Sequence, residues 1–190
     1  MVDLKEAAHQ HNWRRTGFMD KVFVPEEQHA IEEAIIDKDV LVWVFWSMKE
    51  AAYKAHQRIY DLPRRLNWLD FRCSVQNSTA NSAKGVVSIG ALKYHTTTVI
   101  AKEHLHTYAT PHPDLEVEVL CEIGSSNYLK TRLLTRVSSW LGISISKVLI
   151  IKNSYGVPAI YRDHEQKLFS CFSLSGHGRF NAFSLSLTKS

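Results

Sequence analysis

The spacing of apolar residues predicts three helices. Residues 26–36 begin directly after a proline and carry two acids in the first turn, which suits a helix start because acids favour the positive end of the helix dipole. Residues 40–60 follow Asp39, whose side chain is suited to cap a helix. A third helix is predicted from Ser125 or Ser126 to a glycine at position 142.

The predicted helix over residues 40–60 has two different halves. Its first half is apolar on every side, which indicates deep burial. In its second half one apolar stripe recurs at helical spacing, formed by Met48, Ala52, Ala55 and Ile59. At about 100° per residue, Glu50 and Lys54 fall on the opposite side of this stripe, one turn apart.

Alternating apolar and polar residues predict strands in the rest of the chain. The expected strands cover residues 71–75, 85–89, 96–101, 115–120, 147–152 and 157–160 and two closing segments around Phe172 and Phe183. A polar stretch over residues 77–85 predicts a mobile loop, and residues 153–156 predict a turn. Helices and strands mix without strict alternation, which is typical of an α+β fold.

Composition narrows the class of protein. With 45% hydrophobic and 22% charged residues in 190, the chain has the balance of one globular domain. Its longest apolar run, residues 40–48, is too short to cross a membrane, and its first residues do not resemble a secretory signal. Cys73, Cys121 and Cys171 form no C-x-x-C pair and are expected to be reduced core residues. We therefore expect a cytoplasmic protein with no membrane partner.

Positive charge is in modest excess. The chain has 23 Lys and Arg against 19 Asp and Glu, and a pI near 8.9, which favours an acidic or phosphorylated partner. The excess is too small to indicate nucleic-acid binding, and we expect no nucleic-acid partner. A basic nucleic-acid-binding domain is a more distant alternative, based on residues 12–15 and on Lys130, Arg132 and Arg136, which fit an ordinary solvated surface better.

The most informative stretch is Phe45-Trp-Ser-Met-Lys-Glu-Ala-Ala-Tyr-Lys-Ala55. It resembles the signature helix Trp-Ser-x-Lys-Glu-Ala-x-x-Lys-Ala of the 4'-phosphopantetheinyl transferases, which include the holo-acyl-carrier-protein synthases. Three further segments are similar to motifs of this family and occur in the family's order: residues 21–27, 150–158 and 173–177. Their order and combination carry the resemblance, since each short motif alone is a weak signal.

The resemblance implies a fold and an activity. The fold would be an α+β single lobe of the 4'-phosphopantetheinyl transferase type, one domain over residues 1–190, with a β-rich insertion at about residues 66–123. The reaction would be Mg²⁺-dependent transfer of the 4'-phosphopantetheine arm of coenzyme A to a serine of an apo acyl or peptidyl carrier protein, as in fatty acid biosynthesis. Because the single-lobe members act as trimers, the resemblance also implies a homotrimer.

The charged residues of the signature stretch suit this chemistry. Breaking a pyrophosphate link under high negative charge depends mainly on positioning and electrostatics. Glu50 could hold Mg²⁺ and act as the general base for the carrier serine. Lys54 lies on the same face and could neutralise the attacked phosphate. Lys49 could reach another phosphate or support the fold.

The resemblance assigns roles to further residues. Asp3, together with Glu50, is expected to bind the metal ion. The residues expected to contact coenzyme A are Lys49, Lys54, Gly156, Pro158, Ser173, Ser175 and His177. The residues expected to contact the acidic helix of the carrier protein are Arg14 and Arg15.

Two positions depart from the pattern of the family. Its first strand carries Gly-x-Asp, whereas Asp3 follows Met1-Val2. Asp3 therefore matches either the first metal-binding aspartate or a second acid, with the first lost or upstream of Met1. Gly176 stands where the family has a histidine, and His177 is displaced by one residue, a shift that reverses side-chain direction in a strand. A non-catalytic relative that binds coenzyme A or a carrier protein is the alternative function.

Ordinary interpretations apply to two of these signals. A Glu–Lys pair one turn apart is commonly a solvated helix face, so Glu50 and Lys54 would not indicate catalysis outside the motif. His104 and His106 have the spacing of residues on one face of a strand and could bind a metal ion, although no third ligand stands at a familiar spacing.

Overall fold

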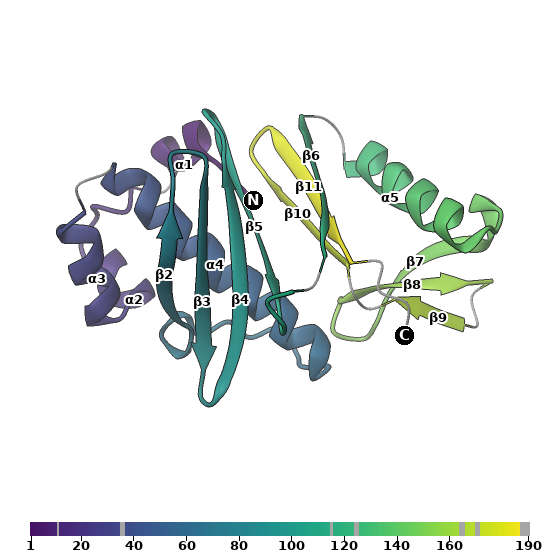
Figure 1. Cartoon of the computed structure of the whole chain (residues 1–190), viewed down its shortest axis with the longest axis horizontal. Helices are drawn as coiled ribbons and strands as arrows, with labels where there is room; N and C mark the ends of the chain where they lie inside the picture. The colour runs from purple at the N-terminus through teal and green to yellow at the C-terminus, as the bar shows by residue number, and fades with distance from the viewer. Residues whose placement is uncertain are drawn as a thin grey trace. The chain divides into compact units, whose positions relative to one another are not determined.

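The computed structural model describes residues 1–10, 12–34, 37–114, 116–123, 126–163, 166–169 and 172–186. The chain divides into two compact units (Figure 1). Unit 1 comprises Met1–His56 and Arg65–Leu115, and unit 2 comprises Gln57–Arg64 and Glu116–Ser190. Within the described residues, no helix is long and apolar enough to span a membrane.

Unit 1 begins with a short strand and short helices that lead into one long helix. In chain order these are β1 (Val2–Asp3), α1 (Leu4–Gln10), α2 (Phe18–Val22), α3 (Pro25–Glu32) and α4 (Lys38–Ile59). The 3-10 helix η1 (Trp68–Asp70) and the strands β2 (Arg72–Ser78), β3 (Ser82–Ile89), β4 (Leu92–Ile100) and β5 (His104–Thr110) follow. The strands form a five-stranded antiparallel sheet in the order β1-β5-β4-β3-β2.

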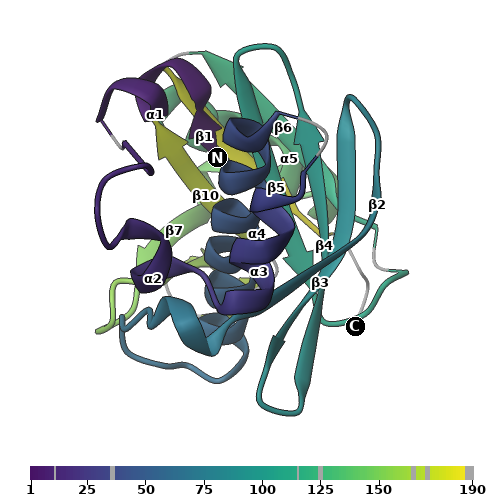
Figure 2. The same cartoon turned by 90° about the vertical axis from the view of Figure 1, so that its left-hand side faces the viewer.

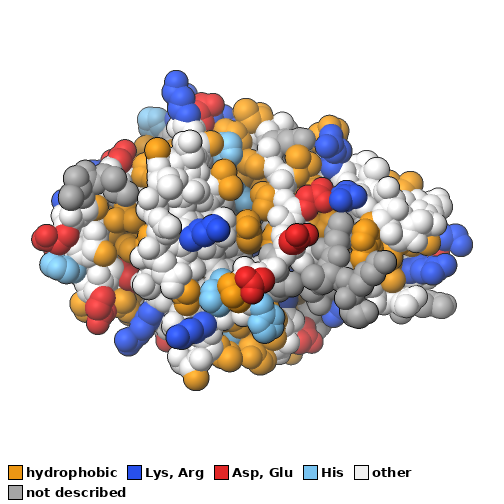
Figure 3. All heavy atoms as spheres, in the orientation of Figure 1, with side chains coloured by type: hydrophobic (Ala, Val, Ile, Leu, Met, Phe, Trp, Pro, Cys, Tyr) orange, Lys and Arg blue, Asp and Glu red, His pale blue; other side chains and the backbone are white. Residues whose placement is uncertain are grey.

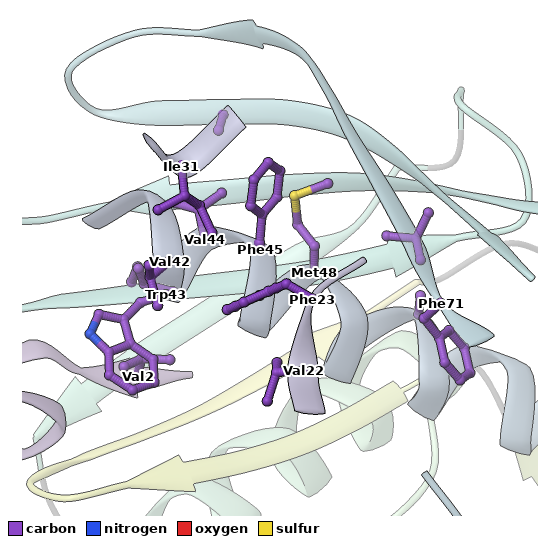
Figure 4. Packing of buried hydrophobic residues seen from close by; sticks show 14 of the residues in the cluster. Val2, Val22, Phe23, Ile31, Val42, Trp43, Val44, Phe45, Met48 and Phe71 are labelled. Atoms are coloured by element: carbon purple, nitrogen blue, oxygen red, sulfur yellow. The ribbon is translucent and has the colours of Figure 1, made fainter. Parts of the chain in front are cut away.

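Helix α4 lies across one face of this sheet (Figures 1 and 2). Its first half is buried, as its apolar sequence predicts. Figure 4 shows the buried side chains around it, among them Phe23, Ile31, Val42, Trp43, Val44, Phe45, Met48 and Phe71. Each large apolar side chain buried in this way contributes roughly 1.5–3 kcal/mol. Helix α4 is therefore the centre of the core of unit 1, and the signature stretch is part of it.

The ends of the first helices differ from the predictions. The predicted cap Asp39 lies within the first turn of α4, and Asp37 takes the capping position. The Oδ1 atom of Asp37 accepts the N–H of Asp39 at 2.9 Å, and its carbonyl accepts the N–H of Leu41 at 3.1 Å. Helix α3 ends at Glu32, earlier than the predicted residue 36, which lies outside the described residues.

The prediction of a mobile loop over residues 77–85 is wrong. Strand β2 continues to Ser78 and β3 starts at Ser82, so these polar residues form the end of a hairpin. The turn is closed by Thr79, whose N–H donates to the carbonyl of Ser82 at 2.8 Å and whose hydroxyl accepts the N–H of Ser82 at 3.1 Å. Polar composition indicated exposure here, but it did not exclude strand pairing.

Unit 2 contains a second long helix and two small antiparallel sheets. Its elements are β6 (Glu118–Ile123), α5 (Ser126–Leu141), η2 (Ile145–Lys147), β7 (Val148–Lys152), β8 (Pro158–Arg162), β9 (Gln166–Phe169), β10 (Phe172–His177) and β11 (Phe180–Leu185). The sheets have the orders β10-β11-β6 and β7-β8-β9. The predicted stripe of α5 is buried in one core with residues of both sheets, including Leu129, Leu133, Val137, Val148, Ile160, Phe172 and Phe183.

The mixture of helices and antiparallel sheets confirms the predicted α+β class. The helices predicted over residues 40–60 and from Ser126 to Gly142 are confirmed to within two residues. Gly142 ends the second of them with a positive φ of 66°, which glycine adopts without strain. The single domain with a β-rich insertion stays a prediction.

Candidate functional site

Helix α4 fixes the orientation of the signature stretch. Met48 and Ala52 are buried in the core of unit 1, as the predicted stripe requires. On another face, the hydroxyl of Ser47 lies 2.6 Å from that of Thr107 on β5, which lies 2.8 Å from that of Thr98 on β4. This buried chain of hydroxyl groups fixes the rotation of α4 against the sheet.

Glu50 and Lys54 form an ion pair on the surface of α4. Their carboxylate and ammonium groups are 2.7 Å apart, and their side chains are 24% and 26% exposed. The pair is therefore accessible, yet partly desolvated, which strengthens its interaction with a charged ligand. This arrangement brings together the two residues predicted to be catalytic.

Lys49, the residue next to Glu50, has a different environment. Its ammonium lies 2.7 Å from the carboxylate of Glu27, with side-chain exposures of 0% and 1%. It also donates hydrogen bonds to the carbonyls of Val22 at 2.8 Å and Trp68 at 3.0 Å. These three contacts match the three donors of an ammonium group and support the fold. Contact between Lys49 and coenzyme A stays a prediction.

Asp3 lies in β1, at the edge of the sheet of unit 1. It is fully buried, and its Oδ1 accepts the N–H groups of Lys5 at 3.1 Å and Glu6 at 3.3 Å, which begins helix α1. In the register of β1 and β5, Asp3 is opposite His104. One oxygen of this carboxylate is thus already occupied by the start of α1, and binding of a metal ion by Asp3 stays a prediction.

His106 follows on the same strand and is 3% exposed. Its Nδ1 has no hydrogen-bond partner among the described residues. Burial is the main reason that the pKa of His106 is lowered to about 3, and the N-terminal amino group, Lys54 and His104 contribute to this shift by electrostatic repulsion. His106 is therefore neutral at pH 7.

Among the described residues, the side chains that could hold a metal ion are few. Within the described ranges of the chain, no group of three or more His, Cys, Asp or Glu side chains could hold a metal ion, and His104 and His106 are included in that finding. Mg²⁺ commonly takes only one or two protein carboxylates and completes its shell with substrate phosphates and water. Glu50 and Asp3 are carboxylates of the kind that Mg²⁺ takes as ligands, and their joint binding of one metal ion stays a prediction.

Arg14 and Arg15 lie between α1 and α2. Arg14 forms a two-pronged ion pair with Asp39, at 2.8 and 3.3 Å, and its guanidinium lies over the ring of Trp13. The Trp13 indole also donates to Asp39. Asp39 therefore serves this surface cluster, and the pair with Arg14 lowers the pKa of its carboxyl group against the opposing effect of burial. Carrier-protein contact by both arginines stays a prediction.

Residues 173–177, the last of the segments similar to motifs of the family, lie on β10, which pairs with β11. Because β10 is a regular strand through His177, the displaced histidine and Gly176 point to opposite faces. The space beside Gly176 is filled: a Cβ atom built there would lie 2.5 Å from Oδ1 of Asn181, its cross-strand neighbour. The side chain of Asn181 thus occupies the space that a larger residue at position 176, such as the family's histidine, would need.

An open pocket of about 180 Å³ adjoins Gly176 within unit 2. Helix α5, β10 and β11 line it with Ser126, Leu129, Lys130, Leu174, Ser175, Gly176 and Asn181. The lining combines an ammonium group, two hydroxyl groups and an amide around an apolar floor. It includes Ser175, one of the residues predicted to contact coenzyme A.

The predicted turn at residues 153–156 is confirmed. The Oδ1 atom of Asn153 accepts the N–H groups of Tyr155 at 3.0 Å and Val157 at 2.9 Å. Gly156 has a positive φ of 73°, and a Cβ atom there would lie 3.2 Å from the guanidinium of Arg64. This explains the Asn-x-x-Gly pattern by local geometry. Coenzyme A contact by Gly156 and Pro158 stays a prediction.

Arg58 was not predicted from the sequence. It stands one turn after Lys54 on α4, and its Nη1 lies 3.5 Å from the hydroxyl of Ser173 while its guanidinium lies over the ring of Phe172. Burial lowers the pKa of Arg58 to about 10, so the group remains charged at pH 7. The spacing of residues 50, 54 and 58 was the signal that could have identified it.

Comparison with protein families found one match. The model of the 4'-phosphopantetheinyl transferase superfamily matches residues 1–110, which include β1, the signature stretch and the strands up to β5. No curated protein and no solved structure matches the chain. The match covers more than half of the chain and confirms the resemblance inferred from the motifs.

Proposed function

Since the chain belongs to the 4'-phosphopantetheinyl transferase superfamily, we propose that it transfers the 4'-phosphopantetheine arm of coenzyme A to a serine of an apo acyl or peptidyl carrier protein, in a Mg²⁺-dependent reaction. The observation that carries this proposal is the accessible Glu50–Lys54 pair within the matched stretch. The other product would be adenosine 3',5'-bisphosphate.

Each charged group has a proposed role in the transfer. Lys54 binds the phosphate under attack and neutralises part of its charge. To do so, its ammonium group leaves the carboxylate of Glu50 and pairs with the phosphate of the substrate. Glu50 accepts the proton of the carrier serine. Mg²⁺, held by Glu50 and Asp3, would supply further charge neutralisation at the pyrophosphate. Lys49 holds the helix in place through Glu27.

We further propose that unit 2 binds the nucleotide half of coenzyme A. Lys130 and Ser175 line one pocket with the start of helix α5, and both an ammonium group and a helix N-terminus favour phosphate. Ser173, His177, Gly156 and Pro158 are the additional contacts proposed by resemblance. The homotrimer remains a proposal by resemblance, and the cytoplasmic location remains a proposal from the sequence composition.

A non-catalytic relative that binds coenzyme A or a carrier protein is the second candidate. One observation favours it: Asp3 is fully buried, and its carboxylate already accepts two backbone N–H groups. A carboxylate engaged in this way has less freedom to approach a metal ion.

An intact-mass assay tests both candidates. The protein is incubated with Mg²⁺, coenzyme A and a panel of apo carrier proteins, and each carrier is weighed before and after. A phosphopantetheine mass gain that requires the carrier serine is expected and would establish the transferase. Binding of coenzyme A without any mass gain, in the presence of Mg²⁺, would support the non-catalytic alternative.

A further inference from the structure

Large hydrophobic side chains are exposed where α4 ends and the chain enters unit 2. Ile59, Tyr60 and Leu62 are 49%, 48% and 36% exposed, and Tyr155, in the turn before β8, is 42% exposed. We refer to these four residues as the apolar patch. A cluster of exposed apolar side chains is typical of a site that binds another macromolecule.

Hydrogen bonds connect the segments that carry the patch. Asn153 donates to Asp61 at 2.8 Å, and Arg64 donates to the carbonyl of Gly156 at 3.0 Å. The segment after α4 is also closed on itself, because the N–H of Leu62 donates to the carbonyl of Gln57 at 3.0 Å. The four residues of the apolar patch therefore lie on two segments of unit 2 that hydrogen bonds hold together.

Positive charge accompanies the apolar patch. Arg64 lies against Gly156, the residue after Tyr155. Lys152, at the end of β7 before the turn, is exposed. The carboxylate of Asp61 accepts a hydrogen bond from Asn153. Unit 2 as a whole contains 11 Lys and Arg but six Asp and Glu, a net charge of +5, whereas unit 1 has 12 and 13, a net charge of −1. Figure 3 shows Lys and Arg side chains over α5 and β7–β9.

We propose that the apolar patch and Arg64 are a docking surface for the acceptor carrier protein. The inference rests on the proposed function and names where on this chain its protein substrate binds. Four large apolar groups suit a protein, because coenzyme A is a polyanion and would be bound mainly by cations and hydroxyl groups. The adjoining cations select a partner with an acidic surface, and tyrosines are frequent anchors of protein interfaces.

The test compares two leucines with similar exposure. Leu62 lies in the apolar patch, and Leu92, 39% exposed, lies at the end of the β3–β4 hairpin in unit 1. Leu62→Asp is expected to raise the KM for an apo carrier protein about tenfold or more and to leave the KM for coenzyme A unchanged. Leu92→Asp is expected to change neither constant. Tyr60→Ala provides a second, uncharged probe of the patch.

Each result decides between specific explanations. Equal KM values for Leu62→Asp and Leu92→Asp, in a protein that transfers the arm, would overturn the docking surface and leave the proposed function intact. A rise in the KM for coenzyme A alone would mean that the nucleotide binds there, and a change of oligomeric state with unchanged KM values would mean that a second copy does. If the unmodified protein neither transfers the arm nor binds any carrier protein, both proposals fail.

A substitution of Arg64 tests the contribution of charge to carrier-protein binding. Arg64→Glu is expected to weaken carrier-protein binding about tenfold at low salt, with a smaller effect at high salt, because exposed charges are screened. The matched control is Arg162→Glu, an exposed arginine on β8 in the same unit. An equal loss in both variants would show that only the net charge of unit 2 matters and would overturn the specific role of Arg64.

Discussion

The two units follow the same order of elements and use it differently. Each begins with a strand, continues through a long helix into antiparallel strands, and ends with a strand that pairs with the first: β1 with β5 in unit 1, and β6 with β11 in unit 2. Unit 1 places a single wide sheet against α4, whereas unit 2 divides its strands between two small sheets under α5.

The difference between the units lies in their charged groups. Unit 1 has nearly balanced charge and carries both a buried ion pair and an accessible one on α4. Unit 2 has an excess of cations, a hydroxyl-lined pocket and an exposed apolar patch. Under the proposed function, unit 1 would supply the acid–base groups and unit 2 the binding surfaces. The following predictions would break or sharpen that division.

The largest effect is expected for the buried ion pair of unit 1. Lys49→Met leaves the carboxylate of Glu27 buried without its cation, which should lower the free energy of unfolding by about 3–5 kcal/mol. Urea unfolding monitored by tryptophan fluorescence measures this loss. Glu27→Gln with Lys49→Met should recover part of it, because no unpaired charge remains buried. A Lys49→Met protein with unchanged stability would contradict the structural role of Lys49.

The next effect concerns activity and not stability. Glu50→Gln and Lys54→Ala should each reduce transfer at least about 100-fold, an effect of about 2.7 kcal/mol on the barrier. Their partly exposed ion pair contributes only about 0.3–0.5 kcal/mol to stability, so both variants should unfold at nearly the same urea concentration as the unmodified protein. The carrier mass assay and urea unfolding give the two readings. Retained turnover in both variants would remove the acid–base role from unit 1.

The contrast between residues 49 and 50 shows what the sequence could predict. Helical spacing placed Glu50 and Lys54 on one face of α4 and the apolar stripe on another. The structure confirms the stripe at Met48 and Ala52, which are buried, but the stripe is wrong at its end, where Ile59 is 49% exposed. The partner of Lys49 could not be predicted, because Glu27 lies on a separate helix and is brought to it only by the packing of α3. Spacing within one element is local information, whereas a buried ion pair depends on tertiary structure.

The same distinction applies to strands. The turn at residues 153–156 could be predicted because its asparagine and glycine act locally. The relation of Gly176 to Asn181 could not, because it depends on the register between β10 and β11. Strand β9 was not predicted, and β1, only two residues long, carries too little pattern to be recognised. The candidate site residues of unit 1 could thus be placed on their helix from the sequence, whereas their neighbours in space could not.

An intermediate effect is expected from the buried histidine of unit 1. The pKa of His106 is about 3 in the folded protein and about 6.5 in an unfolded chain. Below pH 6.5 the unfolded chain binds a proton that the folded state excludes, so stability is lost as the pH falls from 6.5 towards 3. At pH 5 this loss should be about 2 kcal/mol relative to pH 7.5.

His106→Phe removes this titration and should reduce the pH 7.5 to pH 5 difference in unfolding free energy by about that 2 kcal/mol. Urea unfolding at both pH values measures it. The exposed His9 provides the control, since His9→Gln should leave the difference unchanged. If His106→Phe retains the full pH dependence, another group is responsible, and His106 is not excluded from protonation in the folded state.

The smallest effect is expected in the pocket of unit 2. Ser175→Ala removes one hydroxyl group from the pocket lining and should raise the KM for coenzyme A about three- to tenfold, since a single hydrogen bond contributes about 0.5–1.5 kcal/mol. The KM for the carrier protein and the unfolding free energy should remain unchanged. Ser146→Ala, at an exposed serine in η2 outside the pocket, is the matched control. A change in the carrier KM instead, with coenzyme A unaffected, would mean that the pocket contacts the protein substrate. Binding of both substrates would then have to be reassigned within unit 2, while the acid–base role of unit 1 would remain as tested by Glu50 and Lys54.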